Sequence, residues 1–322
     1  MPTPRAQLIS LRDTPWYHVV SRCVRRAFLC GVDHYTGEDY EHRRAWVEKR
    51  VMAVSRVFAI DVASYAIMSN HYHLVLRVDV EHAAAWSTDE VIARWHTLFN
   101  GSLLSKRYQE RPETLSPGER AQVLERAAVW RTRLMDISWF MRCVNEPIAR
   151  MANGEDRCTG SFWEGRFKSQ ALLDEQAILA AMAYVDLNPV RAQMADTPEA
   201  SDHTSIQQRI EHARKGEIPA GLMRFQGNER KDKLTGIPFA LEHYVELVDW
   251  TGRITRTNKR GSITSDLPPI LERLGIGEET WLILSCEFED SFSQWVGSEA
   301  AKRRATRNVG KTCSRSPPIP AG

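Results

Sequence analysis

The sequence predicts an α+β fold with a central antiparallel sheet of about four to five strands and helices on one face. Two observations carry this prediction. Residues 16–24, 61–68 and 71–78 are rich in β-branched and aromatic side chains, as strands are. Residues 39–57 and 174–188 instead place apolar side chains at helical spacing. Strands alternating with helices in this way indicate a sheet covered by helices.

Composition indicates a folded, globular chain. The 322 residues are 43% hydrophobic and 26% charged, which excludes disorder as the main state. No apolar run approaches the roughly 18 residues of a membrane span, and the first residues lack the apolar core of a signal peptide, so we expect a cytoplasmic protein. The net charge of +2 does not by itself indicate nucleic acid as a partner. The six cysteines form no C-x-x-C pair, so neither a zinc knuckle nor a redox dithiol is indicated.

The N-terminal elements can be assigned in order. The strand at 16–24 (WYHVVSRCV) is followed directly by two arginines, and the segment 39–57 has the spacing of an amphipathic helix. The segments 61–68 and 71–78 are joined by Ser69-Asn70, which is typical of a β-hairpin. The second of them, HYHLVLRV, alternates cleanly, and we expect it to be the central strand.

The rest of the chain contains one more strand and several helices. Residues 80–132 are helical in composition and read as an insertion, and a helix over 136–151 contains Pro147, which should kink or interrupt it. A strand is expected within 160–173, and a last core helix begins after Asp174 and ends at Pro189. We therefore expect a core at 14–195 with the insertion at about 80–132, a C-terminal extension or small accessory domain at 196–300, and a basic flexible tail at 301–322.

His71 and His73 form the sharpest local motif. Because side chains alternate along a strand, both histidines share one face about 7 Å apart, where both imidazoles can bind one divalent ion. Two half-exposed histidines on a sheet surface would show the same pattern.

Tyr184 and Asn188 are four residues apart on the last core helix, which places both on one face. A phenol and an amide oxygen could then point at one site. Pro189 biases Asn188 away from helical geometry, and a buried tyrosine followed by a C-terminal cap remains an alternative.

Basic residues gather near the predicted strand ends. On one rim of the sheet they could neutralise phosphates, although a solvated surface is the commoner role of such residues. The candidates for DNA binding are Arg22, Arg25, Arg26, Arg166 and Lys168.

Together these segments resemble a known family. The order YHVVSRCVRRAFL, MSNHYHLVLRV, GSFWEGRFKSQ and YVDLNPVRA resembles the single-tyrosine HUH transposases of the insertion-sequence-200-like type, and more closely the REP-associated tyrosine transposases. The resemblance covers about residues 14–80 and 133–195. It implies an HUH-type core of ferredoxin or RRM-like topology.

The resemblance also implies a chemistry. Tyr184 would be the nucleophile, and His71, His73 and Asn188 would hold a divalent metal ion, Mg²⁺ or Mn²⁺. The enzyme would be a DNA transposase and endonuclease that cleaves and rejoins single-stranded DNA beside a hairpin through a 5′-phosphotyrosine. The implied partner is palindromic single-stranded DNA, without a membrane, bound by a monomer or a homodimer associated with the nucleoid.

Three other functions compete with this interpretation. A host-retained protein could bind hairpin DNA or RNA without strand transfer. A metal-dependent hydrolase on a (β/α)₈ barrel also uses H-x-H, but it needs eight βα units that this chain does not show. A zinc deaminase requires H-x-E and P-C-x-x-C, which are absent.

Overall fold

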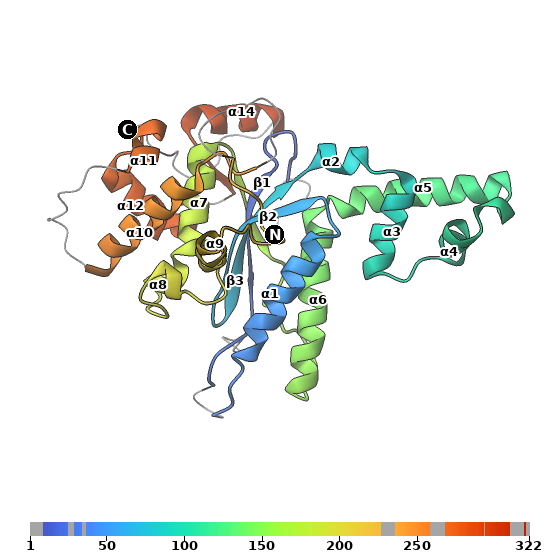
Figure 1. The fold of residues 1–322 in the computed structure, drawn as a ribbon, viewed down its shortest axis with the longest axis horizontal. Helices are drawn as coiled ribbons and strands as arrows, with labels where there is room; N and C mark the ends of the chain where they lie inside the picture. The colour runs from blue at the N-terminus through green and yellow to red at the C-terminus, as the bar shows by residue number, and fades with distance from the viewer. Residues whose placement is uncertain are drawn as a thin grey trace. The chain divides into compact units, whose positions relative to one another are not determined.

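The α+β class is confirmed by a computed structural model, which describes residues 9–24, 29–33, 37–226, 236–257, 268–292, 294–309 and 319. It contains a five-stranded sheet in the order β2-β3-β1-β4-β5. Its strands are β1 (Trp16–Arg22), β2 (Ile60–Ile67), β3 (His71–Val78), β4 (Lys168–Leu172) and β5 (Trp295–Val296). The strands β1, β2 and β3 lie side by side in Figure 1. The hairpin expected from Ser69-Asn70 is present, because β2 and β3 are neighbours. The strand of the two histidines, β3, is interior, while β1 occupies the centre.

The sheet is mixed, which corrects the antiparallel expectation. β1 pairs antiparallel with both β3 and β4, but β4 pairs parallel with β5, where Ala171 lies opposite Trp295. The two-residue strand β5 comes from the C-terminal extension. Local alternation could not predict this strand, because two residues carry no periodicity.

Helices lie on both faces of the sheet, which corrects the expectation of one covered face. Tyr65 of β2 donates a hydrogen bond to Glu48 of α1 (His42–Ser55) at 2.6 Å. The adjacent Ser64 faces the other way, and its Oγ lies 3.1 Å from Ser205 Oγ of α9 (Ser205–Arg214). Apolar positions on both strand faces need such cover, since Ile60 to Ile67 is almost entirely buried.

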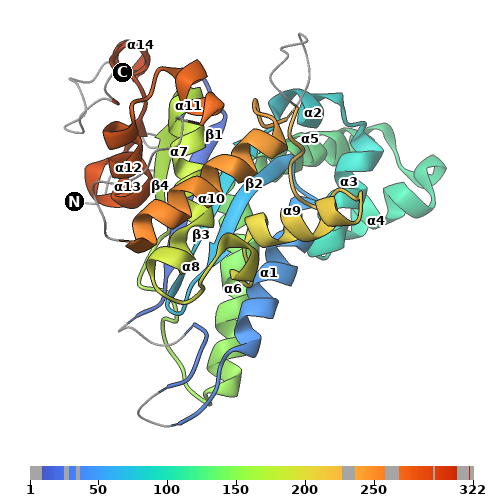
Figure 2. The same cartoon turned by 60° about the vertical axis from the view of Figure 1, so that its left-hand side comes forward.

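Helix α7 (Glu175–Asp186) lies between the sheet and the C-terminal helices (Figures 1 and 2). Asp174 caps it by accepting from the backbone N–H of Ala177. One apolar cluster joins Val75 of the sheet, Leu179 of α7 and Trp281 of the C-terminal extension. Besides α9 and the 3₁₀ turn η4 (Pro198–Ala200), the extension helices are α10 (Leu241–Thr257), α11 (Pro269–Leu274), α12 (Glu278–Cys286) and α13 (Phe288–Ser291). The C-terminal extension therefore shares its core with the tyrosine helix.

The chain divides into two compact units. The first contains residues 1–48, 62–77 and 161–322, and the second contains residues 49–61 and 78–160. The second unit holds the region expected as a helical insertion, and it is helical. Its elements beyond α1 are α2 (Val80–Ala85), α3 (Thr88–Leu98), α4 (Leu103–Glu110), the 3₁₀ turn η3 (Pro112–Thr114), α5 (Pro117–Leu134) and α6 (Ile137–Glu155). Pro147 lies inside α6, which continues through it.

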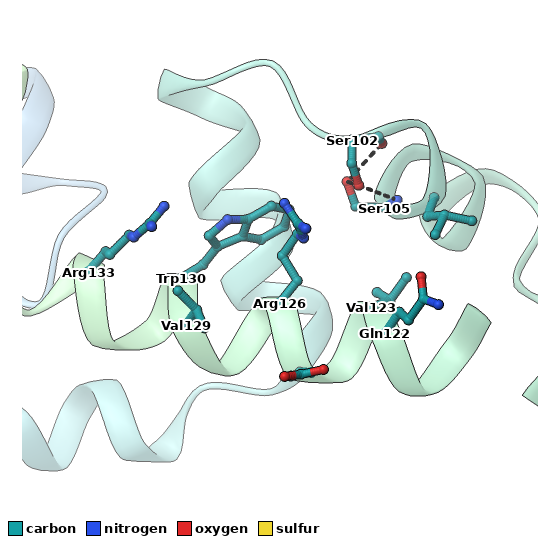
Figure 3. Close-up of a pocket in the computed structure, with 10 residues that line it drawn as sticks. Ser102, Ser105, Gln122, Val123, Arg126, Val129, Trp130 and Arg133 are labelled. Carbon is teal, nitrogen blue, oxygen red and sulfur yellow. Dashed lines mark hydrogen bonds between the residues drawn. The ribbon is translucent and has the colours of Figure 1, made fainter. Parts of the chain in front are cut away.

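Aromatic side chains hold the second unit together. Trp95 of α3 stacks on Trp130 of α5 with ring centroids 5.3 Å apart. Ser116 and Glu119 form a capping box at the start of α5. A cavity of about 500 Å³ lies between α4 and α5, lined among others by Arg126, Trp130, Ser102 and Ser105 (Figure 3). None of the residues predicted to bind metal or DNA lines it.

The last described helix covers the start of the segment 301–322, which was expected to be a flexible tail. Helix α14 spans Glu299–Val309 and buries Ala301, Lys302 and Ala305. These three positions share one helical face. The many basic residues of this segment favoured a flexible tail over a packed helix. Most of the remaining tail lies outside the described residues. Among the described helices, none is long and apolar enough to cross a membrane.

Candidate active site

The two histidines of the motif lie on one face of β3, as alternation predicts. His73 is directly opposite Val20 of β1, and His71 is opposite Arg22. The two imidazole ring centroids are 4.7 Å apart. His71 Nδ1 lies 2.5 Å from Asn70 Oδ1, and His73 is fully buried.

His18 of β1 extends this face and was not singled out from the sequence. It lies opposite Gln170 of β4, and its Nδ1 is 2.7 Å from Gln170 Oε1. Its Nε2 is 3.0 Å from His73 Nδ1, and the two rings are parallel within 4°. Pairing of β1 with β3 brings His18 next to His73, and pairing of β1 with β4 brings Gln170 next to His18.

Helix α7 brings Tyr184 to the same face. Its ring centroid is 5.7 Å from that of His73 and 6.1 Å from that of His18. Asn188 begins the short helix α8 (Asn188–Arg191), and its amide nitrogen lies 3.0 Å from His73 Nε2. The structure therefore brings together all four residues that were predicted to hold the nucleophile and the metal.

Arg191 lies against the tyrosine. Its guanidinium carbon is 4.0 Å from the centroid of the Tyr184 ring. Burial lowers the pKa of Arg191, and the interaction with Tyr184 opposes this shift. One of its nitrogens also donates to the Ser285 carbonyl at 2.7 Å. A buried cation beside a phenol favours the phenolate form, which is the nucleophilic one.

Burial keeps the three imidazoles neutral at neutral pH. Loss of solvation lowers the pKa of His71 to about 4, with smaller contributions from the charge of Arg22 and from the neighbouring His18 imidazole. Burial also lowers the pKa of His73 and of His18. Neutral imidazoles have lone pairs available for a metal ion.

Glu289 adds a carboxylate from α13. Its Oε1 lies 3.4 Å from His73 Nδ1 and is buried without a hydrogen-bond partner among the described residues. His18, His73 and Glu289 together place three potential ligand atoms within 4.8 Å of one another. This grouping differs from the predicted ligand set, with which it shares only His73.

Exposed basic residues lie at the end of the sheet that carries His71. Lys168 is the first residue of β4 and lies opposite Val20, in the same row as His73. Arg22 is exposed beside His71, and Arg166 is exposed just before β4. Within the described part of the chain, none of these three side chains forms an ion pair. Arg25 and Arg26 lie outside the described residues.

The residues missed by sequence reasoning have no local signature. His18 lies in the segment YHVVSRCVRRAFL, two positions before Val20. The only signal for it was that residues two apart on a strand share a face, which puts His18 on the same face as Val20. Arg191 lies in YVDLNPVRA, while Gln170 and Glu289 belong to segments without a recognisable metal or catalytic pattern. Strand pairing and the packing of the extension bring them to the site.

Comparison with known proteins adds one finding. No family model matches the chain, and no curated protein matches it either. A solved structure of a REP-associated tyrosine transposase bound to a REP hairpin aligns with this chain at 10% sequence identity and a TM-score of 0.37. The alignment covers 70% of this chain and 92% of that chain. At this level of similarity, function has to be argued from the site itself.

Proposed function

We propose that this protein is a metal-dependent DNA transposase of the single-tyrosine HUH type, related to the REP-associated tyrosine transposases. It would cleave and rejoin single-stranded DNA beside a hairpin through a 5′-phosphotyrosine. The observation that carries the proposal is the meeting of Tyr184, His73 and Asn188, in which Asn188 Nδ2 is 3.0 Å from His73 Nε2 and the tyrosine ring packs on the same imidazole. The core that performs this chemistry would be residues 14–195.

The donor set fits a divalent ion. His71 and His73 offer neutral imidazoles on one strand face, and rotation of the Asn188 amide would present its oxygen beside them. Mg²⁺ and Mn²⁺ accept such oxygen and nitrogen ligands. When bound by His71, His73 and Asn188, the ion would polarise the scissile phosphate and stabilise the leaving 3′ oxygen.

Tyr184 performs the covalent step. Its phenolic oxygen attacks phosphorus, the bond from phosphorus to the 3′ oxygen breaks, and the phenolic proton is lost to solvent while the leaving oxygen gains one. A free phenol has a pKa near 10, so the charge of Arg191 beside it assists by favouring the phenolate. The phosphotyrosine conserves the energy of the phosphodiester, so a second 3′-hydroxyl can reverse the step without ATP.

The DNA would approach the end of the sheet where His71 lies. Arg22, Arg166 and Lys168 are exposed there and are our candidates for contacts to phosphates. Such contacts bind the backbone irrespective of sequence, so they position the strand without selecting the hairpin.

The test is a covalent-adduct assay on the full chain. The protein is mixed with end-labelled single-stranded hairpin oligonucleotides from palindromes flanking its gene, with Mg²⁺ or Mn²⁺, and resolved on a denaturing gel. We expect an adduct that a chelator abolishes. Tyr184→Phe should abolish it completely, because the benzene ring retains the packing but has no nucleophile.

Tyr108→Phe is the matched control, since Tyr108 is a phenol on α4 of the second unit and should be dispensable. Hairpin binding should survive in Tyr184→Phe. Tight binding without an adduct under either metal would reject strand transfer and favour the hairpin-binding alternative.

A further inference from the structure

We propose that His18 is a positioning residue that fixes the tautomer of His73, and that a chain of hydrogen bonds from the Phe292 carbonyl sets this tautomer. The inference rests on the proposed function in one respect: it assigns Nε2 of His73 as the nitrogen offered to the metal. The chain runs Phe292, Gln170, His18, His73, Asn188, and each link is 2.6–3.0 Å long.

The direction of the chain follows from its first link. The Phe292 carbonyl oxygen can only accept, so the Gln170 group 2.6 Å away must be its NH₂. This orients Gln170 Oε1 toward His18 Nδ1, 2.7 Å away, and an amide oxygen also only accepts. His18 Nδ1 must therefore carry a proton.

The next link fixes His73. Both rings are fully buried, so the neutral form of His18 has its lone pair on Nε2. That lone pair lies 3.0 Å from His73 Nδ1, which must therefore be the N–H donor. His73 Nε2 then has a lone pair, directed at the Asn188 amide 3.0 Å away.

Glu289 supports the same assignment independently. Its Oε1 lies 3.4 Å from His73 Nδ1 and accepts no hydrogen bond from a described residue. A proton on Nδ1 would lie between two acceptors, whereas a lone pair there would face a carboxylate. Both neighbours of Nδ1 therefore favour the Nδ1–H form. Partners of this kind orient ligating histidines and typically change metal affinity about 10–100-fold when removed.

The primary experiment reads the tautomers directly by ¹⁵N NMR of histidine-labelled, metal-free full-length protein near neutral pH. We expect both His18 and His73 in the Nδ1–H form. In His18→Phe, which retains a ring against Phe288 but offers no acceptor, His73 should lose part of this preference, since Glu289 alone then favours a proton on Nδ1. His73 in the Nε2–H form in the unmodified protein, or an unchanged tautomer in His18→Phe, would overturn the inference.

Three further variants protect the test against a folding defect. Gln170→Met has a similar length but no amide, so His18 should lose its fixed tautomer, whereas His18→Gln restores an acceptor and should rescue His73 in part. Phe288→Leu is the packing control, because it touches the His18 ring without a hydrogen bond, and both tautomers should persist.

Metal affinity provides the second measurement. Titration with Mn²⁺, followed by electron paramagnetic resonance, should show affinity about 10–100-fold weaker in His18→Phe and a smaller loss in His18→Gln. Equal affinities in all proteins would overturn the positioning role. The adduct assay tests the proposed function separately. If the tautomers are as expected but no adduct forms, the proposed function is rejected and this inference stands. If an adduct forms but the tautomers differ from those expected, this inference is rejected and the proposed function stands.

Discussion

Two buried polar networks flank helix α7, and they differ in whether all of their carboxylate acceptors are used. Around Asp186, near the end of the helix, one carboxylate oxygen accepts from Ser205 Oγ at 2.5 Å and from the backbone N–H of Ile206 at 3.2 Å. The other accepts from Tyr244 Oη at 2.5 Å, and the buried charge of Arg209 acts on the same carboxylate. Both oxygens of Asp186 are used, so this network has no free acceptor, although Arg209 Nε lacks a hydrogen-bond partner among the described residues.

The network around His73 leaves an acceptor unused. It contains neutral imidazoles, a lone pair that meets only the Asn188 amide, and a Glu289 oxygen without a partner in the described chain. Native proteins leave few buried polar groups unsatisfied, and those that remain often mark function. Burial and polarity alone therefore do not distinguish a site from a structural network; an unused acceptor, as on Glu289, does.

The largest effect should come from breaking the Asp186 network. Asp186→Ala removes the acceptor for three donors and leaves Arg209 buried without its opposing charge, which typically costs about 3–5 kcal/mol of folding free energy. Urea denaturation measures this loss. Asp186→Ala protein that remains folded should bind Mn²⁺ with the affinity of the unmodified protein. A loss of metal affinity in this folded variant would contradict the claim that the Asp186 network is separate from the metal site.

The His73 network should be sensitive to acid. The pKa of His71 is about 4 in the folded metal-free protein and about 6.5 in the unfolded chain, so protonation favours unfolding. The stability is fully present above pH 6.5 and is lost as the pH falls toward 4, by up to about 3 kcal/mol from this residue.

The measurement compares unfolding free energies of the unmodified protein and His71→Gln between pH 7.5 and 4. Because glutamine does not titrate, the difference between the two proteins should shrink or reverse as the pH falls, while the contributions of other groups cancel. A difference independent of pH would contradict the burial of His71 as a neutral ring.

The smallest effect concerns the exposed basic residues beside His71, at the end of the sheet that carries the His73 network. Arg22→Gln and Lys168→Gln should each weaken binding of single-stranded DNA a few-fold and reduce the slope of log affinity against log salt by about 0.7, because each removes one phosphate contact. Fluorescence anisotropy at several salt concentrations measures this slope. Lys106→Gln on α4 is the matched exposed cation, and an equal reduction there would argue against a rim that binds DNA.

Much of the fold was predictable because its signals are local. The hairpin of β2 and β3, the start of α7 after Asp174 and the helical character of residues 80–132 follow from alternation, capping and composition. The parallel strand β5, the second covered face and helix α14 did not follow. A two-residue strand has no period, and the buried face of α14 is defined by what packs against it.

The candidate site divides in the same way. The sequence by itself determined that His71 and His73 share a strand face, because this relation depends only on backbone periodicity. Tyr184 and Asn188 were expected on one helix, but α7 ends at Asp186 and Asn188 begins α8, so local spacing did not determine their relation. Only the tertiary structure decided that His18, Gln170, Arg191 and Glu289 join them. His18 and Gln170 meet through pairing of β1 with β4, and Glu289 arrives from more than two hundred residues beyond His73. Contacts between distant segments depend on how the whole chain packs, and no local pattern of residues records them.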